Sequence, residues 1–288
     1  MAADLNVRYV NHEGSSFTLQ GDGKTFLDVL PLYSFSWDYE LINDVTGMGG
    51  SAAGFSRFPR TMDLELRMRG FSRAQFLEQM NALHAITEVD ALSAQPGRLW
   101  VGDQYISCFL AVSGEVESAP RLGNFATQTV TVLVVRPFWC TEQEYTFNPA
   151  TAEEESPEDM GKKYDLRYPY RYGSGLASST LRNTHYAACP AIITIYGPAS
   201  SPSVQIAGHT YAVDVTLAAN QRLVIDGTTR KIYTVGSDGA ETNVFNLRDK
   251  SSDPFAPVPV GESPVVYSGE YLMTITLVEQ RSQLKWTI

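Results

Sequence analysis

The stretch TLQGDGKTF (18–26) contains Gly23, Lys24 and Thr25 in the order that ends a phosphate-binding loop. Such a loop also needs a glycine five residues before Gly23 and a helix after Thr25, so that backbone N–H groups can surround a phosphate. Thr18 occupies the glycine position, and no apolar helical pattern follows. We therefore interpret the segment as a Gly-Asp-Gly turn between two strands.

Other residue types that can do chemistry are present without the spacing that the chemistry needs. Zinc ligands recur a few residues apart, and a serine or cysteine nucleophile has a recognisable local context. The carboxylates lie mostly in one acidic segment or on strand faces that water covers, where they are ordinary solvated acids. We predict no catalytic residue, no bound metal and no cofactor. The histidines and cysteines that lie singly are His12, His84, His185, His209, Cys108, Cys140 and Cys189.

Two further segments invite a ligand. GMGGSAAGF (47–55) is rich in glycine but lacks the GxGxxG order of a dinucleotide site. It is either a mobile loop or a segment that becomes ordered against a neighbouring copy. Arginines also gather around residues 57–73, where acidic residues alternate with them, and ion pairs between strands explain them better than a phosphate track. These residues are Arg57, Arg60, Arg67, Arg69 and Arg73, with Asp63 and Glu65.

Charge and composition exclude several classes of partner. The 288 residues carry a formal charge of −10, which disfavours attraction to DNA or to an anionic membrane. Hydrophobic residues make up 43% of the chain, enough to fill ordinary cores, but no run approaches the length of a membrane helix. The three cysteines do not form a disulfide framework, and the N-terminus lacks the pattern of a signal peptide. We expect assembly in a reducing cytoplasm, without membrane insertion or nucleic-acid specificity.

The elements that would position any site begin with a strand at 60–69. In RTMDLELRMR, apolar and charged residues alternate, which predicts one buried face and one wet face. A helix follows directly, with Ser72 and Gln75 as its capping box and Phe71 expected to pack on Phe76. Its apolar stripe predicts that one face lies on a sheet.

Four more strands are expected in the first block. RLWVGDQYISCFLAV (98–112) predicts a hairpin, and ATQTVTVLVVRP (126–137) predicts a strand that Pro137 ends. PLYSFSWDYEL (31–41) alternates aromatic with other residues. The aromatic row either packs in its own domain, which is the simpler interpretation, or contacts a neighbouring copy. Its members are Tyr33, Phe35, Trp37 and Tyr39.

An acidic segment rich in proline separates two blocks of different character. The second block is almost all short strands and turns, with no helical period, which is typical of an antiparallel β-sandwich. We therefore expect a first domain at residues 1–145, a linker at 146–163 and a second domain at 164–288.

The order of motifs resembles that of siphophage distal tail proteins. The motifs are FPRTMDLELRMRG (58–70) with its helix, then ACPAIITIYGPASSPSVQIAGHTY (188–211), LAANQRLVIDGTTRKIYTV (217–235), DPFAPVPVGESPVVYSG (253–269) and YLMTITLVEQRSQLKWTI (271–288). The resemblance covers nearly the whole chain. It implies a mainly β fold: an N-terminal tail-tube-like β-sandwich or barrel with one flanking α-helix, and a C-terminal galectin-like antiparallel β-sandwich.

The resemblance also implies a function. Such proteins are structural hubs that assist host attachment at the tip of a long non-contractile phage tail. There they form a hexameric ring between the tail tube protein and a tail-associated hub protein, and they can carry receptor-binding protein. We therefore expect no enzymatic activity and a location in the virion tail. The alternative is a carbohydrate-binding module of a tail fibre or cell-surface protein. The residues expected at the ring interface are Tyr33, Phe35, Trp37, Tyr39, Met48 and Phe55.

Overall fold

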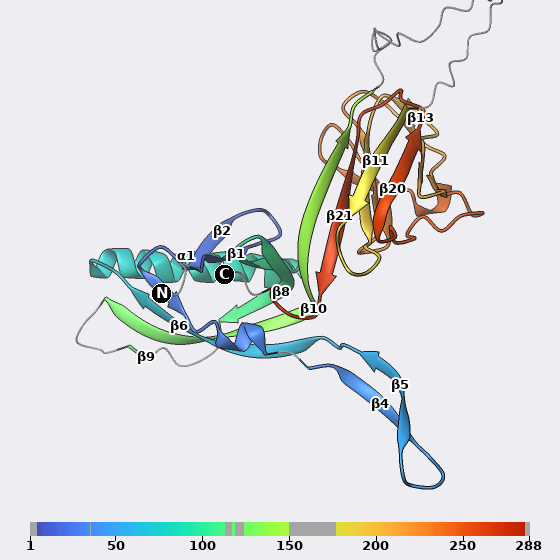
Figure 1. Cartoon of the computed structure of the whole chain (residues 1–288). Coiled ribbons are helices and arrows are strands. Elements are labelled where there is room, and N and C mark those ends of the chain that lie inside the picture. Colours follow the sequence, from blue (N-terminus) through green and yellow to red (C-terminus); the bar gives the residue numbers. More distant parts are fainter. Residues whose placement is uncertain (1–4, 35, 113–116, 119–123, 150–176, 286–288) are drawn as a thin grey trace, which may run out of the picture. The chain divides into compact units, whose positions relative to one another are not determined.

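The computed structural model describes residues 5–34, 36–112, 117–118, 124–149 and 177–285 (Figure 1). The chain divides into two compact units. Unit 1 comprises Met1–Thr141 and Gln280–Ile288, and unit 2 comprises Glu142–Glu279. The sequence pattern assigned the last residues to the second domain, whereas the structure groups them with unit 1. Of the expected linker, residues 150–163 lie outside the described part of the chain.

Unit 1 is built on an antiparallel sheet. Its strands pair in the order β2-β1-β7-β8-β10-β6-β3, and β9 also pairs with β10. The strands are β1 (Val7–Val10), β2 (Ser16–Gln20), β3 (Thr25–Leu27), β6 (Arg60–Arg69), β7 (Gly97–Val101), β8 (Gln104–Val112), β9 (Glu117–Ser118) and β10 (Phe125–Phe147).

The alternating pattern of β6 is confirmed. Leu64, Leu66 and Met68 are fully buried, while the charged residues between them are exposed. The expected hairpin at 98–112 is also confirmed, because β7 and β8 pair across a turn at Gly102. A chain that alternates in this way buries one face of the sheet and leaves the other in water.

Helix α1 (Arg73–Ser93) covers part of this sheet and packs against β8 and β2. The Ser72 side chain accepts a hydrogen bond from the Gln75 N–H, so the predicted cap is confirmed. The expected packing of Phe71 on the first turn is wrong, since Phe71 is 82% exposed. The buried face holds Phe76 and Leu83 as expected, and also a carboxylate, Asp90, that the apolar stripe did not indicate.

Pro137 does not end β10, as the sequence had predicted. The strand continues to Phe147, and its register against β8 shifts between Val134 and Arg136 and again between Arg136 and Cys140. Proline cannot donate a ladder hydrogen bond, but a bulge does not require one. The irregular register therefore allows the strand to pass through the proline.

The segment at 31–41 is not the single strand that alternation predicted. A short 3-10 helix, η1 (Leu30–Tyr33), begins around Pro31, and a strand, β4 (Asp38–Asn43), begins only later. The glycine-rich segment is not a loop either, because β5 (Gly50–Ser56) pairs with β4 as a hairpin. The small residues of β5 still permit strand geometry, and pairing with β4 satisfies their backbone groups.

Unit 2 is a β-sandwich, as its turn-rich sequence predicted. One sheet has the order β19-β18-β17-β12-β21 and the other β11-β20-β14-β15, and one apolar core lies between them. The strands are β11 (Ala177–Asn183), β12 (Ala191–Tyr196), β13 (Ala199–Ser200), β14 (Ser203–Ile206), β15 (His209–Ala212), β16 (Thr216–Leu217), β17 (Arg222–Asp226), β18 (Lys231–Val235), β19 (Glu241–Asn243), β20 (Gly261–Tyr267) and β21 (Met273–Arg281), with a short η2 (Phe245–Leu247).

The hairpin of β17 and β18 shows how a turn is held in this unit. The Asp226 carboxylate accepts hydrogen bonds from the backbone and hydroxyl groups of both Thr228 and Thr229. The N–H of Gly227 donates to the Ala191 carbonyl at 2.9 Å. A side chain at Gly227 would bring its Cβ to 2.7 Å from that oxygen, so only glycine fits there.

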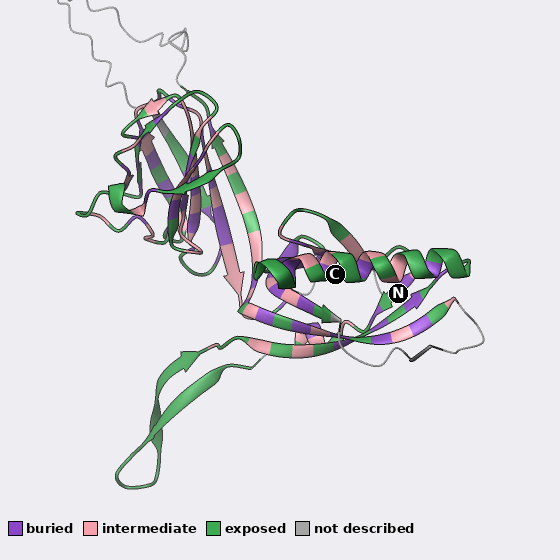
Figure 2. Cartoon of the chain, turned by 180° about the vertical axis from the view of Figure 1, so that it is seen from behind, coloured by how far each residue is buried: buried purple, intermediate pink, exposed green. Residues whose placement is uncertain are grey.

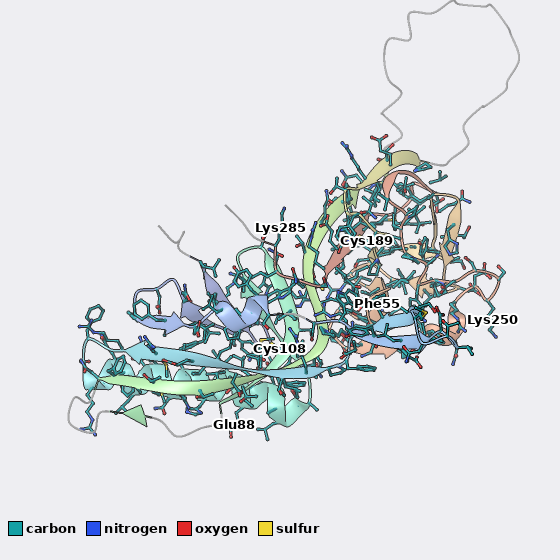
Figure 3. The ribbon with its side chains drawn as sticks, turned by 60° about the horizontal axis from the view of Figure 1, so that its bottom comes forward. Phe55, Glu88, Cys108, Cys189, Lys250 and Lys285 are labelled. Carbon is teal, nitrogen blue, oxygen red and sulfur yellow. The ribbon has the colours of Figure 1, made fainter. Side chains whose placement is uncertain are left out.

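The three cysteines are free thiols. Cys108 is buried in unit 1 and Cys189 in unit 2 (Figure 3). No helix among the described residues is long and apolar enough to cross a membrane.

Candidate functional site

The hairpin of β4 and β5 is the most exposed part of unit 1. Every residue of both strands is exposed, and in Figure 2 the hairpin is coloured as exposed along its whole length. Figure 1 shows it extending away from β6 and the other strands of the unit. We call residues 37–56 the arm.

The arm carries large apolar side chains that contact no core. Val45 and Met48, at the turn, are almost fully exposed, and the others are about half exposed or more. A contiguous exposed apolar surface in a water-soluble chain usually marks a contact with another molecule. The side chains are Trp37, Tyr39, Leu41, Ile42, Val45, Met48 and Phe55.

The structure brings three of the six expected interface residues together. The ring centroids of Trp37 and Tyr39 each lie 6.4 Å from that of Phe55, which is labelled in Figure 3. Met48 lies at the turn of the same hairpin. Tyr33 does not join this group, since it packs against the core of unit 1.

Phe35 lies outside the described residues. For Trp37 and Tyr39, the simpler interpretation as core residues is wrong, because they are 45% and 63% exposed. Aromatic residues do alternate with others in this segment, but β4 lies outside the main sheet of unit 1. Neither face of β4 is therefore covered. The sequence analysis missed Leu41, Ile42 and Val45, although ELINDV next to a glycine-rich segment contains them.

Arg57 anchors the base of the arm. Its guanidinium lies 5.3 Å from the ring centroid of Trp37 and 5.2 Å from that of Phe138 in β10. Nη1 of Arg57 donates a hydrogen bond to the Ser282 carbonyl at 2.8 Å. Partial burial lowers the pKa of Arg57, and the neighbouring Arg60 lowers it further, while Asp38 acts in the opposite direction. The cation is thus held by aromatic faces and one carbonyl.

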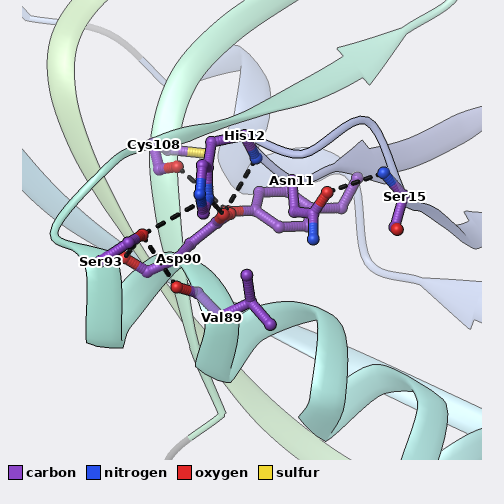
Figure 4. A network of polar contacts seen from close by, with 8 residues as sticks. Asn11, His12, Ser15, Val89, Asp90, Ser93 and Cys108 are labelled. Carbon is purple, nitrogen blue, oxygen red and sulfur yellow. Dashed lines mark hydrogen bonds and ion pairs between the residues drawn. The ribbon is translucent and has the colours of Figure 1, made fainter. Parts of the chain in front are cut away.

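A buried polar network lies where β1 meets the end of α1 (Figure 4). The Tyr9 hydroxyl donates to Asp90, and the N–H of His12 donates to the same carboxylate at 2.9 Å. Nδ1 of His12 is 2.5 Å from Asp90 Oδ1 and 3.4 Å from Ser93 Oγ. Burial raises the pKa of Tyr9, and the hydrogen bond to Asp90 raises it further.

This network does not have the geometry of a catalytic triad. In a triad, the carboxylate and the nucleophile contact different nitrogens of the histidine, whereas Asp90 and Ser93 both face Nδ1 of His12. Tyr9 in β1 and His12 just after β1 both contact Asp90 of α1. The network therefore fixes α1 to β1. No sequence motif signalled it, because a tertiary contact alone brings these residues together.

The phosphate-loop candidate is a closed turn. The Asp22 carboxylate accepts hydrogen bonds from the N–H groups of Lys24 and Thr25, at 2.9 and 2.8 Å. Burial opposes ionisation of Asp22, but these hydrogen bonds outweigh it and lower its pKa. The N–H groups that a phosphate would need are occupied by the turn itself.

Two surface hollows in unit 2 lack converging acids and bases. One of about 480 Å³ is lined by Tyr196, Gln221 and Arg222, among others. The other, of about 350 Å³, has Glu270 as the only carboxylate among its lining residues. Within the described part of the chain, no cluster of histidine, cysteine or acidic residues could hold a metal ion.

Fold and site together describe a two-unit, mainly β chain that carries an exposed arm. No family model matches the sequence, and no curated protein matches it. Solved structures do contain similar folds, among them a phage Dit protein and chains of a phage baseplate.

The crystal structure of the SPP1 Dit (gp 19.1) protein, a hub of the adsorption apparatus, matches with a TM-score of 0.56 at 11% identity, over 96% of this chain and 99% of that one. A chain of the activated phage P2 baseplate with Ca matches with a TM-score of 0.62 at 13% identity, over 97% and 99%. A chain of the same baseplate with Sr gives 0.61 at 12% identity, over 98% and 100%. The chain therefore has the Dit fold over nearly its whole length.

Proposed function

We propose that this chain is a structural hub of a long non-contractile phage or prophage tail tip, where it joins the tail tube to the baseplate. The observation that carries the proposal is the match of the whole chain, both units included, to Dit and baseplate proteins. A match confined to unit 2 would instead have favoured the carbohydrate-binding alternative. Because the match extends over the arm-bearing unit 1, the adaptor role explains more of the chain.

The proposed working form is a homo-oligomeric, hexameric ring in the virion, made through unit 1. A subunit of a ring needs a surface that contacts the next copy, and the exposed apolar arm supplies one. Among the residues predicted for this contact we retain Trp37, Tyr39, Met48 and Phe55, and we assign Tyr33 to the core of unit 1. The proposed partners are the tail tube protein and a tail-associated hub protein.

The second unit, of proposed galectin-like type, would carry receptor-binding protein. One apolar core lies between its two sheets, which supports a role as a module on which other virion proteins are placed. The proposed role is structural and not enzymatic. Its support is that the similar chains come from hub and baseplate structures.

Co-assembly tests the proposal directly. The purified chain is mixed with the tail tube protein encoded beside it, and the tube ends are viewed by negative-stain microscopy. We expect a ring at one end of each tube, and a mass by light scattering that corresponds to several copies. A chain that neither binds tubes nor associates with the hub protein would contradict the proposed function.

A further inference from the structure

A second exposed surface of unit 1 carries basic side chains, which the arm lacks. At one end of the three-stranded group β3-β6-β10, exposed phenylalanines alternate with basic side chains. Phe26, Phe71 and Phe125 are 53%, 82% and 37% exposed. We call this surface, with Lys24, Arg69 and Arg73, the basic aromatic patch.

Strand register shows that Phe26, Arg69 and Phe125 share one face. Arg69 pairs with Phe125 on β10, and its N–H donates to the Lys24 carbonyl at the end of β3. Phe26 pairs with Arg67 in the neighbouring row. The residues between them, such as Met68 and Ala126, are buried, so alternation turns Phe26, Arg69 and Phe125 outward. Directly paired side chains on one face lie close enough to contact the same partner.

The acids nearest to the patch, Glu65, Asp22 and Asp28, each accept a hydrogen bond from another group of unit 1. Nε of Arg67 pairs with Glu65 at 2.7 Å, and Asp22 is occupied by its own turn. Among the described residues, no ion pair joins Lys24, Arg69 or Arg73 to an acid. A hollow of about 310 Å³ lies beside Phe26, with Leu27 in its lining. Asp28, Glu65 and Arg67 line the rest of this hollow.

The arm has the opposite charge. Between residues 37 and 56 the sequence has Asp38, Glu40 and Asp44 and no lysine or arginine. The apolar side chains of the arm lie between these acids, as the phenylalanines of the patch lie between its bases. Charge complementarity around an apolar centre is the usual arrangement of a specific protein contact.

The arm and the patch lie at opposite ends of β6. The arm joins β6 near Arg60, whereas the patch surrounds Arg69. Ten residues of strand span about 30 Å at a rise of about 3.3 Å per residue. Two complementary surfaces at opposite ends of one rigid strand meet most simply between different copies. Such head-to-tail contacts build closed rings.

We propose that the arm of one copy docks on the basic aromatic patch of the next copy of this chain. Val45 and Met48 contact Phe26 and Phe71, while Glu40 and Asp44 face Arg69 and Arg73. The inference rests on the proposed ring role and names the two surfaces that make the contact.

Charge exchange tests the contact on the full-length protein. One variant reverses the arm (Glu40→Lys with Asp44→Lys), one reverses the patch (Arg69→Glu with Arg73→Glu), and a third combines all four changes. The self-association constant is measured by analytical ultracentrifugation at low salt. We expect each reversal to weaken association at least tenfold, and the combined variant to recover most of that loss. All these side chains are exposed, and an unchanged melting temperature verifies folding.

The controls are reversals elsewhere on exposed surface, Glu88→Lys on α1 and Lys250→Glu in unit 2 (Figure 3). They should leave association unchanged. A further variant, Phe71→Asp, removes an apolar contact of the patch without changing the arm, and it should also weaken association. Reversals that have no more effect than the controls would overturn the inference, as would a wild-type chain that stays monomeric at millimolar concentration. In either case, rings on tail tubes would still support the proposed function.

Discussion

The guanidinium of Arg57 lies 5.3 Å from the ring centroid of Trp37, so the residue that follows the arm holds the first residue of the arm. The same cation contacts Phe138 and the Ser282 carbonyl. An extended hairpin has no core of its own, and a two-stranded hairpin alone is marginally stable in water. The direction in which the arm leaves unit 1 therefore depends on this anchor.

Replacing Arg57 by alanine should loosen the arm without unfolding unit 1. A cation–π contact contributes about 0.5 to 2 kcal/mol, and each 1.4 kcal/mol corresponds to about a tenfold change in an opening equilibrium. We expect faster amide hydrogen exchange at residues 38–56, measured by mass spectrometry. Arg8→Ala is the matched control, because Arg8 lies 5.4 Å from the Trp100 ring, away from the arm. Equal hydrogen exchange at these residues in Arg57→Ala and Arg8→Ala would contradict the role of Arg57 as the anchor of the arm.

Apolar residues of the arm should matter for association and not for stability. We expect Leu41→Asp with Val45→Asp to leave the melting temperature within about 2 °C, since exposed substitutions rarely change stability by more than about 0.5 kcal/mol. Ring formation on tail tubes should be lost, because buried apolar anchors dominate interface energies. Thr46→Asp, at the same turn, controls for added charge. A large drop in melting temperature would show that the arm packs on its own chain.

Asp90 should be needed for the stability of unit 1. Asp90→Ala would remove the acceptor of the His12 N–H and leave the Tyr9 hydroxyl only the Cys108 carbonyl at 3.3 Å, and each unsatisfied buried group costs about 1 to 3 kcal/mol. We expect a loss of about 2 to 5 kcal/mol in the free energy of unfolding, measured with urea. Glu88→Ala, on the exposed side of the same helix, should change it by less than about 0.5 kcal/mol.

Unit 2 should lose stability in alkali through Tyr211. Burial raises the pKa of Tyr211 to about 12, and the charge of Asp253 contributes. In the unfolded chain the pKa is about 10, so the unfolded state loses its proton first as pH rises. The contribution of Tyr211 to the stability of unit 2 is complete below about pH 10 and is lost between about pH 10 and 12.

Calorimetry between pH 8 and 11.5 checks this dependence. Tyr211→Phe should show a shallower alkaline decline than the wild type, with a lower starting stability because the hydrogen bond to the Ala256 carbonyl is lost. Tyr186→Phe, an exposed tyrosine of the same unit, should retain the full decline. Parallel curves for Tyr211→Phe and the wild type would exclude Tyr211 as the cause.

Gly227 should resist substitution more than Gly54 of the arm. In Gly227→Ala the new Cβ would meet the Ala191 carbonyl at 2.7 Å, and we expect a loss of about 1 to 3 kcal/mol. Gly54→Ala has open space around its Cβ and should be neutral. Urea unfolding of both variants gives the comparison, and equal stabilities would contradict the close approach at Gly227.

Much of the fold was predictable because local patterns and tertiary packing agree. The alternation of β6, the cap of α1 at Ser72 and the turns of unit 2 each depend on residues close together in the chain, and all were confirmed. Pro137 misled the prediction, because a bulge in the pairing with β8 removes the need for its hydrogen bond. Whether a proline meets a regular ladder or a bulge depends on the partner strand.

The candidate site was predictable in part. The aromatic row was recognised as a surface that must pack or meet a partner, but alternation is the same for a buried strand and for a strand that extends into solvent. Only the tertiary structure decided that Trp37 and Tyr39 lie on an arm while Tyr33 joins the core. The network of Asp90 had no sequence signal, since Tyr9, His12 and Asp90 lie on elements distant in sequence.

The sequence by itself determined the class of the molecule: two mainly β blocks, one helix, an acidic surface and no spacing suited to catalysis or metal binding. Those properties follow from composition and from short-range periodicity. The tertiary structure decided which apolar residues remain exposed and which charged residues lie near each end of β6. Exposure and charge placement depend on which strands pair, and pairing joins residues that are far apart in the chain.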